Sequence, residues 1–195
     1  GVAVTLFAAT GTGWGVSGVC GGLVHARRGL VEIPAMAAAL EKAWPFFEGH
    51  IKSPLVRMTE EGTVEAGDYT EGRICGPAML FERGGALDIP AYLQSLFTKA
   101  GCTLVQQKIE SLDELTDFDA IVIAAGAGAP HFVDLPCEEL YGRALVYDVK
   151  PPSHGVLGEV YFAPQGEQLA VGATYEHEIE ERHLEKLRKY ATLMM

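Results

Sequence analysis

The sequence predicts a mixed α/β fold, because strand patterns alternate with helix patterns along the chain. Residues 2–7 form an apolar run rich in β-branched side chains, and the residues that follow are rich in glycine. Residues 120–125 form a second apolar run, continuous in Ile, Val and Ala, which is typical of a buried parallel strand. We therefore expect strands of the parallel type, joined by helices and by β-rich stretches.

Three segments have helix patterns. Residues 33–47 contain Pro34, which suits the first turn of a helix, and a run of alanines, which favours helix. Residues 90–99 follow Asp88, a good N-cap, and precede Gly101, a good helix stop. Residues 178–195 are predicted to form a charged helix.

The remaining segments have strand patterns. Residues 49–82 carry glycines between short alternating runs, which predicts short antiparallel strands. Residues 104–109 are predicted as a buried strand. Residues 142–175 are predicted to contain further strands, broken by Pro151 and Pro152 and by a turn at residues 164–167.

Composition limits the classes of partner. The chain has 195 residues, 48% of them hydrophobic, which is enough to bury a sizeable core. Its 15 Lys and Arg against 26 Asp and Glu give a net charge of -11, which disfavours nucleic acid as a partner. No apolar run reaches the roughly 20 residues of a membrane-spanning helix, and the N-terminus does not read as a signal peptide. These features predict a cytoplasmic protein.

The cysteines and histidines do not have metal-site spacing. Cys20, Cys75, Cys102 and Cys137 are widely separated and form no Cys-x-x-Cys pair. His177 and His183, six positions apart on the predicted helix, would fall on different faces. We expect no metal, and we expect the cysteines to be buried free thiols.

The glycine-rich turn after residues 2–7 suits an anion. Glycine has no Cβ, so main-chain N–H groups can approach a pyrophosphate closely. Ser17 and Gly18, with Gly21 and Gly22, supply a hydroxyl and such N–H groups. An ordinary tight turn would also use these glycines.

Four segments, in order, resemble FAD-dependent amine and amino-acid oxidoreductases of the D-amino-acid-oxidase-like family, which includes glycine and sarcosine oxidases. The first is the strand with its Gly-Val-Ser-Gly and Gly-Leu-Val-His turn, residues 2–25. The second is residues 84–104, similar to a helix and following strand of that family. The third is residues 119–127, and the fourth is Gly166 with residues 171–176, typical of strands that cover the flavin.

The resemblance implies an incomplete FAD-binding, Rossmann-like layer interleaved with an antiparallel β-rich substrate domain. Residues 1–48 and 83–135 would bind FAD, residues 49–82 and 136–177 would form the substrate or cap side, and residues 178–195 would be a helix. The family's first strand and pyrophosphate loop would precede Gly1, and its last strands would follow Met195. We therefore expect a fragment, inactive alone, with a decayed or repurposed member as the alternative.

The resemblance also implies site residues. Ser17, Gly18, Gly21, Gly22 and Leu23 match the flavin loop, Ile109 matches the position that meets the adenine, and Ala125 and Gly126 match a turn close to the cofactor. The last three could equally be plain strand positions. The ribose-binding acid of such folds would fall at Ala8 or Ala9, which cannot accept its hydrogen bonds.

Two charged candidates follow the flavin loop. Some family members place a histidine or arginine near the flavin ring, where positive charge would stabilise the anionic reduced flavin. Here His25 with Arg27 or Arg28 would serve, and we take His25 and Arg28 as the catalytic candidates. The alternative is a loop histidine and solvated arginines. Tyr161 and Tyr175, on strands expected to cover the flavin, could face substrate or the core.

The implied activity is oxidation of the C–N bond of a small amine or amino acid, by hydride transfer to FAD. A second reading is similar to the flavin domain of the tRNA wobble-uridine modifying enzymes, against which the acidity of the chain counts. A third reading is a noncatalytic remnant or interaction domain. For the 195-residue fragment by itself, the exposed face of the truncated sheet would be apolar, and we expect self-association through residues 2–7 or 120–125.

Overall fold

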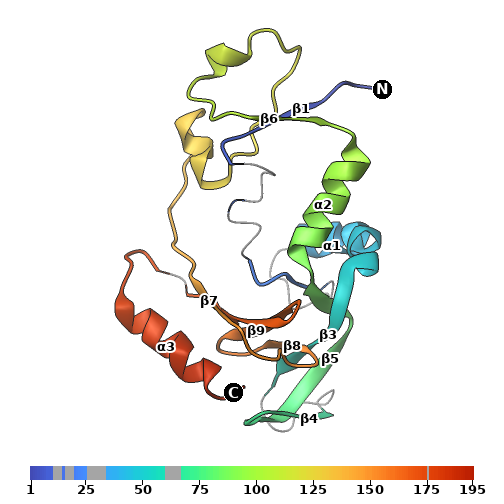
Figure 1. Cartoon of the computed structure of the whole chain (residues 1–195), viewed down its shortest axis with the longest axis vertical. Helices are drawn as coiled ribbons and strands as arrows, with labels where there is room; N and C mark the ends of the chain where they lie inside the picture. Colours follow the sequence, from blue (N-terminus) through green and yellow to red (C-terminus); the bar gives the residue numbers. More distant parts are fainter. Residues whose placement is uncertain (11–14, 16–19, 26–33, 60–66, 175) are drawn as a thin grey trace.

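The computed structural model describes residues 1–10, 15, 20–25, 34–59, 67–174 and 176–195 (Figure 1). Its elements in chain order are β1 Thr5–Ala8, β2 Leu23–His25, α1 Pro34–Phe47, η2 Glu48–His50, β3 Ile51–Met58, β4 Gly67–Glu71, β5 Ile74–Leu87, α2 Ile89–Ala100, β6 Thr103–Gln106, η3 Leu112–Leu115, η4 Gly126–His131, β7 Ala144–Tyr147, β8 Gly155–Leu157, β9 Tyr161–Gln165, β10 Gln168–Gly172 and α3 Glu181–Ala191. The predicted mixture of helices and strands is confirmed.

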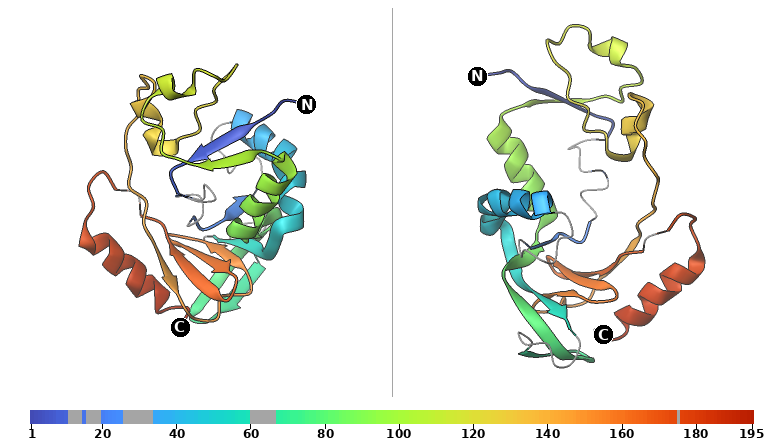
Figure 2. Two further views of the ribbon diagram at one scale, coloured as in Figure 1. Left: turned by 45° about the horizontal axis from the view of Figure 1, so that its top comes forward. Right: turned by 180° about the vertical axis from the view of Figure 1, so that it is seen from behind.

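The described strands form two sheets. β1 and β6 make a small parallel pair, with Thr5 opposite Thr103. The other strands form an eight-stranded sheet in the order β2-β5-β3-β8-β9-β10-β7, with β4 paired to β5. Only the β3–β8 pairing of this larger sheet is parallel. The parallel pair lies at the top of Figure 1 and the larger sheet at the bottom, with α1 and α2 on one side between them (Figures 1 and 2).

The sequence accounts for the start of α1 and for both ends of α2. α1 begins at Pro34. At the start of α2, the Asp88 carboxylate accepts a hydrogen bond from the Ala91 N–H at 3.1 Å. The helix ends at Gly101, whose φ of 61° lies in the left-handed region that glycine adopts without steric cost.

The strand predicted at residues 120–125 is wrong. The structure has no strand there, and the side chain of Val122 is 89% exposed. A strand needs a neighbour that accepts and donates ladder hydrogen bonds, and β1 pairs with β6 alone among the described strands. An apolar sequence by itself therefore did not make this segment a strand.

The strands of the β-rich segments are longer than expected. Residues 49–82 were predicted to form short antiparallel strands, and β3, β4 and β5 do pair antiparallel. However, β5 has 14 residues and continues to Leu87, so Gly84 and Gly85 lie inside a strand. Their neighbours explain the choice of residue, because a Cβ on Gly85 would lie 2.4 Å from the Ile51 side chain and one on Gly84 2.5 Å from Phe81.

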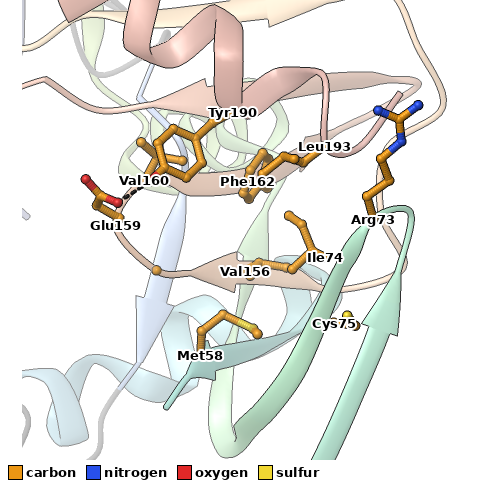
Figure 3. Close-up of a pocket in the computed structure, with 11 residues that line it drawn as sticks. Met58, Arg73, Ile74, Cys75, Val156, Glu159, Val160, Phe162, Tyr190 and Leu193 are labelled. Atoms are coloured by element: carbon orange, nitrogen blue, oxygen red, sulfur yellow. Dashed lines mark hydrogen bonds between the residues drawn. The ribbon is translucent and has the colours of Figure 1, made fainter. Parts of the chain in front are cut away.

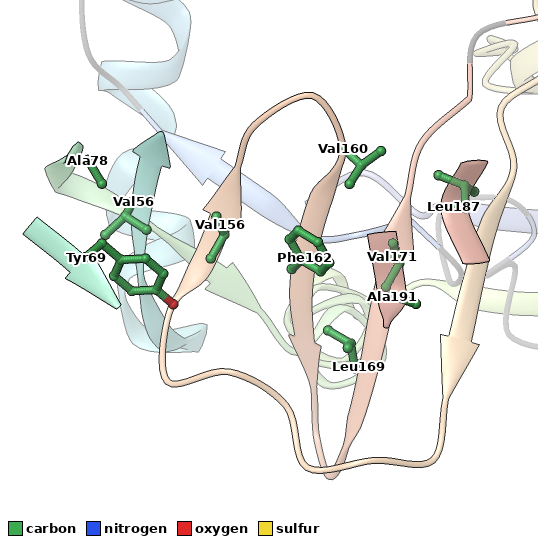
Figure 4. Close-up of a cluster of buried hydrophobic side chains, with 10 residues drawn as sticks. All are labelled: Val56, Tyr69, Ala78, Val156, Val160, Phe162, Leu169, Val171, Leu187 and Ala191. Atoms are coloured by element: carbon green, nitrogen blue, oxygen red, sulfur yellow. The ribbon is translucent and has the colours of Figure 1, made fainter. Parts of the chain in front are cut away.

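The main core lies between the larger sheet and α3. The C-terminal helix, predicted over residues 178–195, forms over Glu181–Ala191 and packs beside β7 and β10. Its Leu187 and Ala191 are fully buried. The strand residues of this cluster that are at most 3% exposed are Val156, Phe162, Leu169 and Val171 (Figure 4).

The cysteines are free, as expected, but burial was the wrong expectation for most of them. Cys20, Cys75 and Cys137 are exposed, and Cys102 is half-buried. Cys20 and Cys137 lie outside the regular strands and helices, where little packs over a side chain. Among the described residues, no helix is both long and apolar enough to cross a membrane.

Candidate cofactor site

The described part of the glycine-rich turn is held against β5. Gly22 has a φ of 64°, and its carbonyl oxygen accepts a hydrogen bond from the Leu87 N–H at 2.9 Å. A Cβ at this position would lie 2.8 Å from the Leu87 carbonyl oxygen and 2.8 Å from Ile89. Glycine is therefore required at this position both by backbone conformation and by space.

The same turn is held against β9. The Gln165 side-chain amide donates a hydrogen bond to the Cys20 carbonyl oxygen at 2.7 Å. Gly21 is buried beside the Tyr161 ring, and a Cβ on Gly21 would lie 2.5 Å from Tyr161 Cε2. Residues 20, 21 and 22 are thus each in contact with the larger sheet. Nothing in the sequence pattern pointed to Leu87 or Gln165 as their partners.

Leu23 begins β2 and belongs to the core. It packs against a small cluster formed by Leu55, Met79 and Phe81. A Cβ on Gly155 would lie 2.8 Å from the Leu23 side chain, so a glycine also makes room for it. The side chain of Leu23 therefore fixes the strand that follows the turn.

His25 ends β2 in an environment that favours the neutral imidazole. Its ring stacks on Phe81, with ring centroids 4.8 Å apart. Burial first, and the charge of Arg57 second, lower the pKa of His25 below its usual 6.5. Its Nδ1 is buried and has no hydrogen-bond partner in the part of the chain that the structure describes. These features oppose a permanent positive charge on His25 at pH 7.

Three of the predicted site residues lie outside the described residues. They are Ser17 and Gly18 of the flavin loop and Arg28, the other catalytic candidate. Arg27 and Tyr175, weighed with them, also lie outside.

The remaining cofactor candidates lie near the parallel β1–β6 pair. Ile109 is half-buried in the segment after β6, and the next residue, Glu110, has its carbonyl oxygen 3.0 Å from His131 Nε2. His131 ends η4, which begins at Gly126 with a φ of 55°. Ala125 is exposed, and its carbonyl oxygen accepts from the Gly128 N–H at 3.0 Å. The segment of Ile109 is thus joined to the short helix that begins at Gly126.

The predicted site therefore falls into two groups. Gly21, Gly22, Leu23 and His25 lie on or beside the eight-stranded sheet. Ile109, Ala125 and Gly126 lie in the part of the chain that includes β6 and η4, at the other end of the molecule (Figure 1). None of the described contacts joins a residue of one group to a residue of the other.

A shallow apolar pocket of about 280 Å³ lies elsewhere, near the end of α3 (Figure 3). Its walls include Met58, Ile74 and Phe162. At one side Glu159 pairs with Lys186 at 2.6 Å and accepts a hydrogen bond from the Tyr190 hydroxyl. None of the sequence-predicted site residues lines this pocket.

No group of three or more metal-ligating side chains occurs in the described part of the chain. Near the described part of the glycine turn, burial lowers the pKa of His25. Residues 20–22 are one cysteine and two glycines, so this part of the turn offers mainly main-chain groups.

Comparison with known proteins gives one clear result. No protein-family model and no curated protein matches the sequence. The fold, however, is similar to that of a glycine oxidase. The crystal structure of glycine oxidase from Geobacillus kaustophilus aligns with a TM-score of 0.69 and 19% sequence identity, covering 97% of this chain and 70% of that one. At this identity the likeness establishes the fold and leaves the activity open.

Proposed function

We propose that this chain is part of an FAD-dependent oxidoreductase that oxidises the C–N bond of a small amine or amino acid. The observation that carries the proposal is the similarity of its fold to glycine oxidase over 97% of the chain. The order of the four sequence segments, from residues 2–25 to residues 166–176, supports it independently. Residues 1–48 and 83–135 would form the cofactor side, and residues 49–82 and 136–177 the substrate side.

The described residues fit a flavin dinucleotide in part. The Cβ space at Gly21 and Gly22 is filled by Tyr161, Ile89 and Leu87, so contact with a pyrophosphate would have to come through main-chain N–H groups of this turn. Ser17 and Gly18 would complete the contacts to the cofactor. Ile109, Ala125 and Gly126 would meet its other end. When bound, FAD would accept the hydride equivalent from the carbon next to nitrogen.

His25 and Arg28 would divide two roles. Because burial lowers the pKa of His25, its imidazole would be neutral at pH 7 and would act by shape and by hydrogen bonding. A permanent positive charge near the flavin would then have to come from Arg28, since a guanidinium remains protonated at any working pH.

The end of β1 does not fit the ribose. β1 ends at Ala8, whose carbonyl oxygen accepts a hydrogen bond from the Gln107 N–H at 2.9 Å, and Ala9 is exposed. Neither methyl group can accept the hydrogen bonds of a ribose hydroxyl. Binding would therefore depend more on the glycine turn than in a fold with an acid at this position.

The test is the flavin content of the full-length product of the gene that encodes this chain. We expect a yellow protein that releases its flavin on denaturation. We also expect the bound flavin to become reduced when small amines or amino acids are added. A colourless product that cannot be loaded with FAD would overturn the proposal and leave a noncatalytic interaction domain. A flavin reduced only in reactions on tRNA would favour the tRNA-modifying alternative.

A variant tests the assigned loop. Gly18→Val adds a β-branched side chain where close main-chain approach is proposed, and we expect FAD affinity to fall by more than tenfold, about 1.4 kcal/mol. Gly49→Val is the matched control, because nothing lies within 4 Å of a Cβ at Gly49. FAD affinity within threefold of wild type in a folded Gly18→Val protein would show that Gly18 does not contact the cofactor.

A further inference from the structure

Two glycines that are distant in the sequence face one aromatic ring. A Cβ built on Gly21 would lie 2.5 Å from Cε2 of Tyr161, and one built on Gly172 would lie 2.6 Å from its Cζ. Real Cβ atoms do not approach a ring carbon so closely. The Tyr161 ring therefore fills space that is open only because both neighbours are glycine.

The two contacts differ in kind. Gly172 is the cross-strand partner of Tyr161 in the β9–β10 hairpin, so the register of the hairpin accounts for that contact. An aromatic ring that covers a glycine on the neighbouring strand is a known way of stabilising a sheet. Gly21 lies outside the hairpin, in the turn before β2. Its contact with the ring joins the turn to the hairpin.

The hydrogen bonds of Cys20 and Gly22 also join the turn to the larger sheet. Gln165, at the other end of β9, donates to the Cys20 carbonyl oxygen at 2.7 Å. The Gly22 carbonyl oxygen accepts from Leu87 of β5 at 2.9 Å. The turn is thus fixed by a hydrogen bond on each side of Gly21, and the ring fixes Gly21 itself.

From this geometry we infer that Tyr161 is a positioning residue for the turn at residues 20–22. The ring, packed against both Gly21 and Gly172, couples the position of the turn to the β9–β10 hairpin. The consequence for FAD rests on the proposed function: a turn held in one place loses less conformational entropy when it binds a ligand. The mechanical coupling is independent of any cofactor.

Hydrogen exchange of the Leu87 amide tests the coupling without FAD, because this N–H bonds to the Gly22 carbonyl oxygen. In Tyr161→Ala we expect this amide to exchange at least about tenfold faster. In Tyr161→Phe, which keeps the ring, we expect a rate within about twofold of wild type. The Val105 amide of β6, in the other sheet, should not respond and serves as the internal control.

A second variant changes Gly21 instead of Tyr161. Gly21→Ala places a methyl group against the ring, and should accelerate the same Leu87 amide, whereas Gly49→Ala should not, because a Cβ there meets nothing within 4 Å. This pair keeps the test valid if Tyr161→Ala does not fold. The inference is overturned if the exchange rate of the Leu87 amide is unchanged in both Tyr161→Ala and Gly21→Ala. Where Tyr161→Ala does not fold, an unchanged rate in Gly21→Ala alone overturns it.

FAD affinity of the full-length product is the second readout. We expect Tyr161→Ala to weaken FAD binding by about fivefold or more, and Tyr161→Phe to restore it. If even the wild-type protein binds no FAD, the proposed function fails, and the exchange experiment still decides the role of Tyr161. A further outcome is that FAD binds equally well to all variants while the exchange of the Leu87 amide responds. In that case Tyr161 positions the turn, but the turn does not hold the cofactor, and the stated consequence for FAD fails.

Discussion

Arg143 and Glu176 form a two-pronged ion pair at the start of the C-terminal helix α3. The Arg143 Nε and Nη2 atoms lie 3.0 and 2.8 Å from the two carboxylate oxygens, and the Glu176 side chain is fully buried. Glu176 also accepts from the Glu180 N–H at 3.0 Å and lies 2.8 Å from His183 Nδ1. The Glu176 carboxylate therefore joins Arg143, the residue before β7, to the start of α3.

The pair predicts a dependence of stability on pH. Hydrogen bonds from Arg143 hold the pKa of Glu176 well below its usual 4.5. A carboxyl whose pKa is lowered by folding contributes stability that is complete above the unfolded-state pKa and is lost as pH falls below it. We expect the melting temperature to fall steeply below about pH 4.5 in the wild type and less steeply in Glu176→Gln.

A matched variant separates this pair from the general effect of acid. Glu167 lies exposed in the turn between β9 and β10. Glu167→Gln should keep the wild-type profile of melting temperature against pH. Parallel profiles for wild type and Glu176→Gln between pH 3 and 6 would contradict the assignment.

Leu187 should be the most costly position on α3. Its side chain is 1% exposed and packs against the strands of the main core. Leu187→Ala should lower the free energy of unfolding by about 2–5 kcal/mol, from lost transfer energy and the cavity that remains. Urea unfolding followed by circular dichroism measures it, with Glu185→Ala on the exposed face of the same helix as control. A loss below about 1 kcal/mol would mean that α3 does not pack as described.

His25 should titrate below the usual range of histidine. Burial and Arg57 lower its pKa, so the folded state binds fewer protons than the unfolded state below pH 6.5, and stability should decline as pH falls through this region. NMR of the ring protons gives the pKa directly, with the same protein in concentrated urea as the reference. A folded-state pKa above the urea value would restore the earlier expectation of a positive charge on His25.

The local features of the fold could be predicted from the sequence. Pro34 at the start of α1, and Asp88 and Gly101 at the ends of α2, act within a few residues of themselves, so their effect does not depend on the rest of the chain. The Gly166 turn between β9 and β10 is of the same kind, with a φ of 60°. Each was predicted at its place.

Features that depend on distant partners could not be predicted. Residues 120–125 have the composition of a buried strand, yet strand formation depends on a neighbour that composition does not reveal. The packing of Gly21 against the ring of Tyr161, more than a hundred residues later, has no signal in the sequence. The packing of Leu23 against Leu55, Met79 and Phe81 has none either, and the assignment of Gly21 and Leu23 to the cofactor site stays a prediction. A single sequence does not show which residues meet across such distances.

β1 pairs with β6 alone among the described strands, and its other edge predicts self-association of the chain. Leu6 of β1 is 38% exposed, and Val2 and Val4, in the segment before the strand, are 90% and 54% exposed, so this end of the chain presents apolar side chains to solvent. An apolar edge strand pairs readily with another chain, and a lysine on the edge blocks such pairing. Sedimentation should show concentration-dependent dimers that Val4→Lys abolishes. Val146→Lys, on the outer strand β7, is the control. If only this change abolishes the dimers, the contact lies at the eight-stranded sheet and not at β1.

The 195-residue chain should bind FAD weakly, and one substitution should raise its affinity for FAD. β1 ends at Ala8, and Ala9 follows it, where a ribose-binding acid would stand. Each missing charge-assisted hydrogen bond costs about 1.5–3 kcal/mol, or roughly tenfold to a hundredfold in affinity. Ala9→Glu would return such an acceptor to an exposed position, whereas Thr10→Glu adds the same charge one residue further on. Titration followed by flavin fluorescence should therefore show Kd values above the low micromolar range for wild type and Thr10→Glu, and a tighter one for Ala9→Glu. Saturation of the wild type at low micromolar FAD would mean that another segment holds the ribose, since neither alanine can do so.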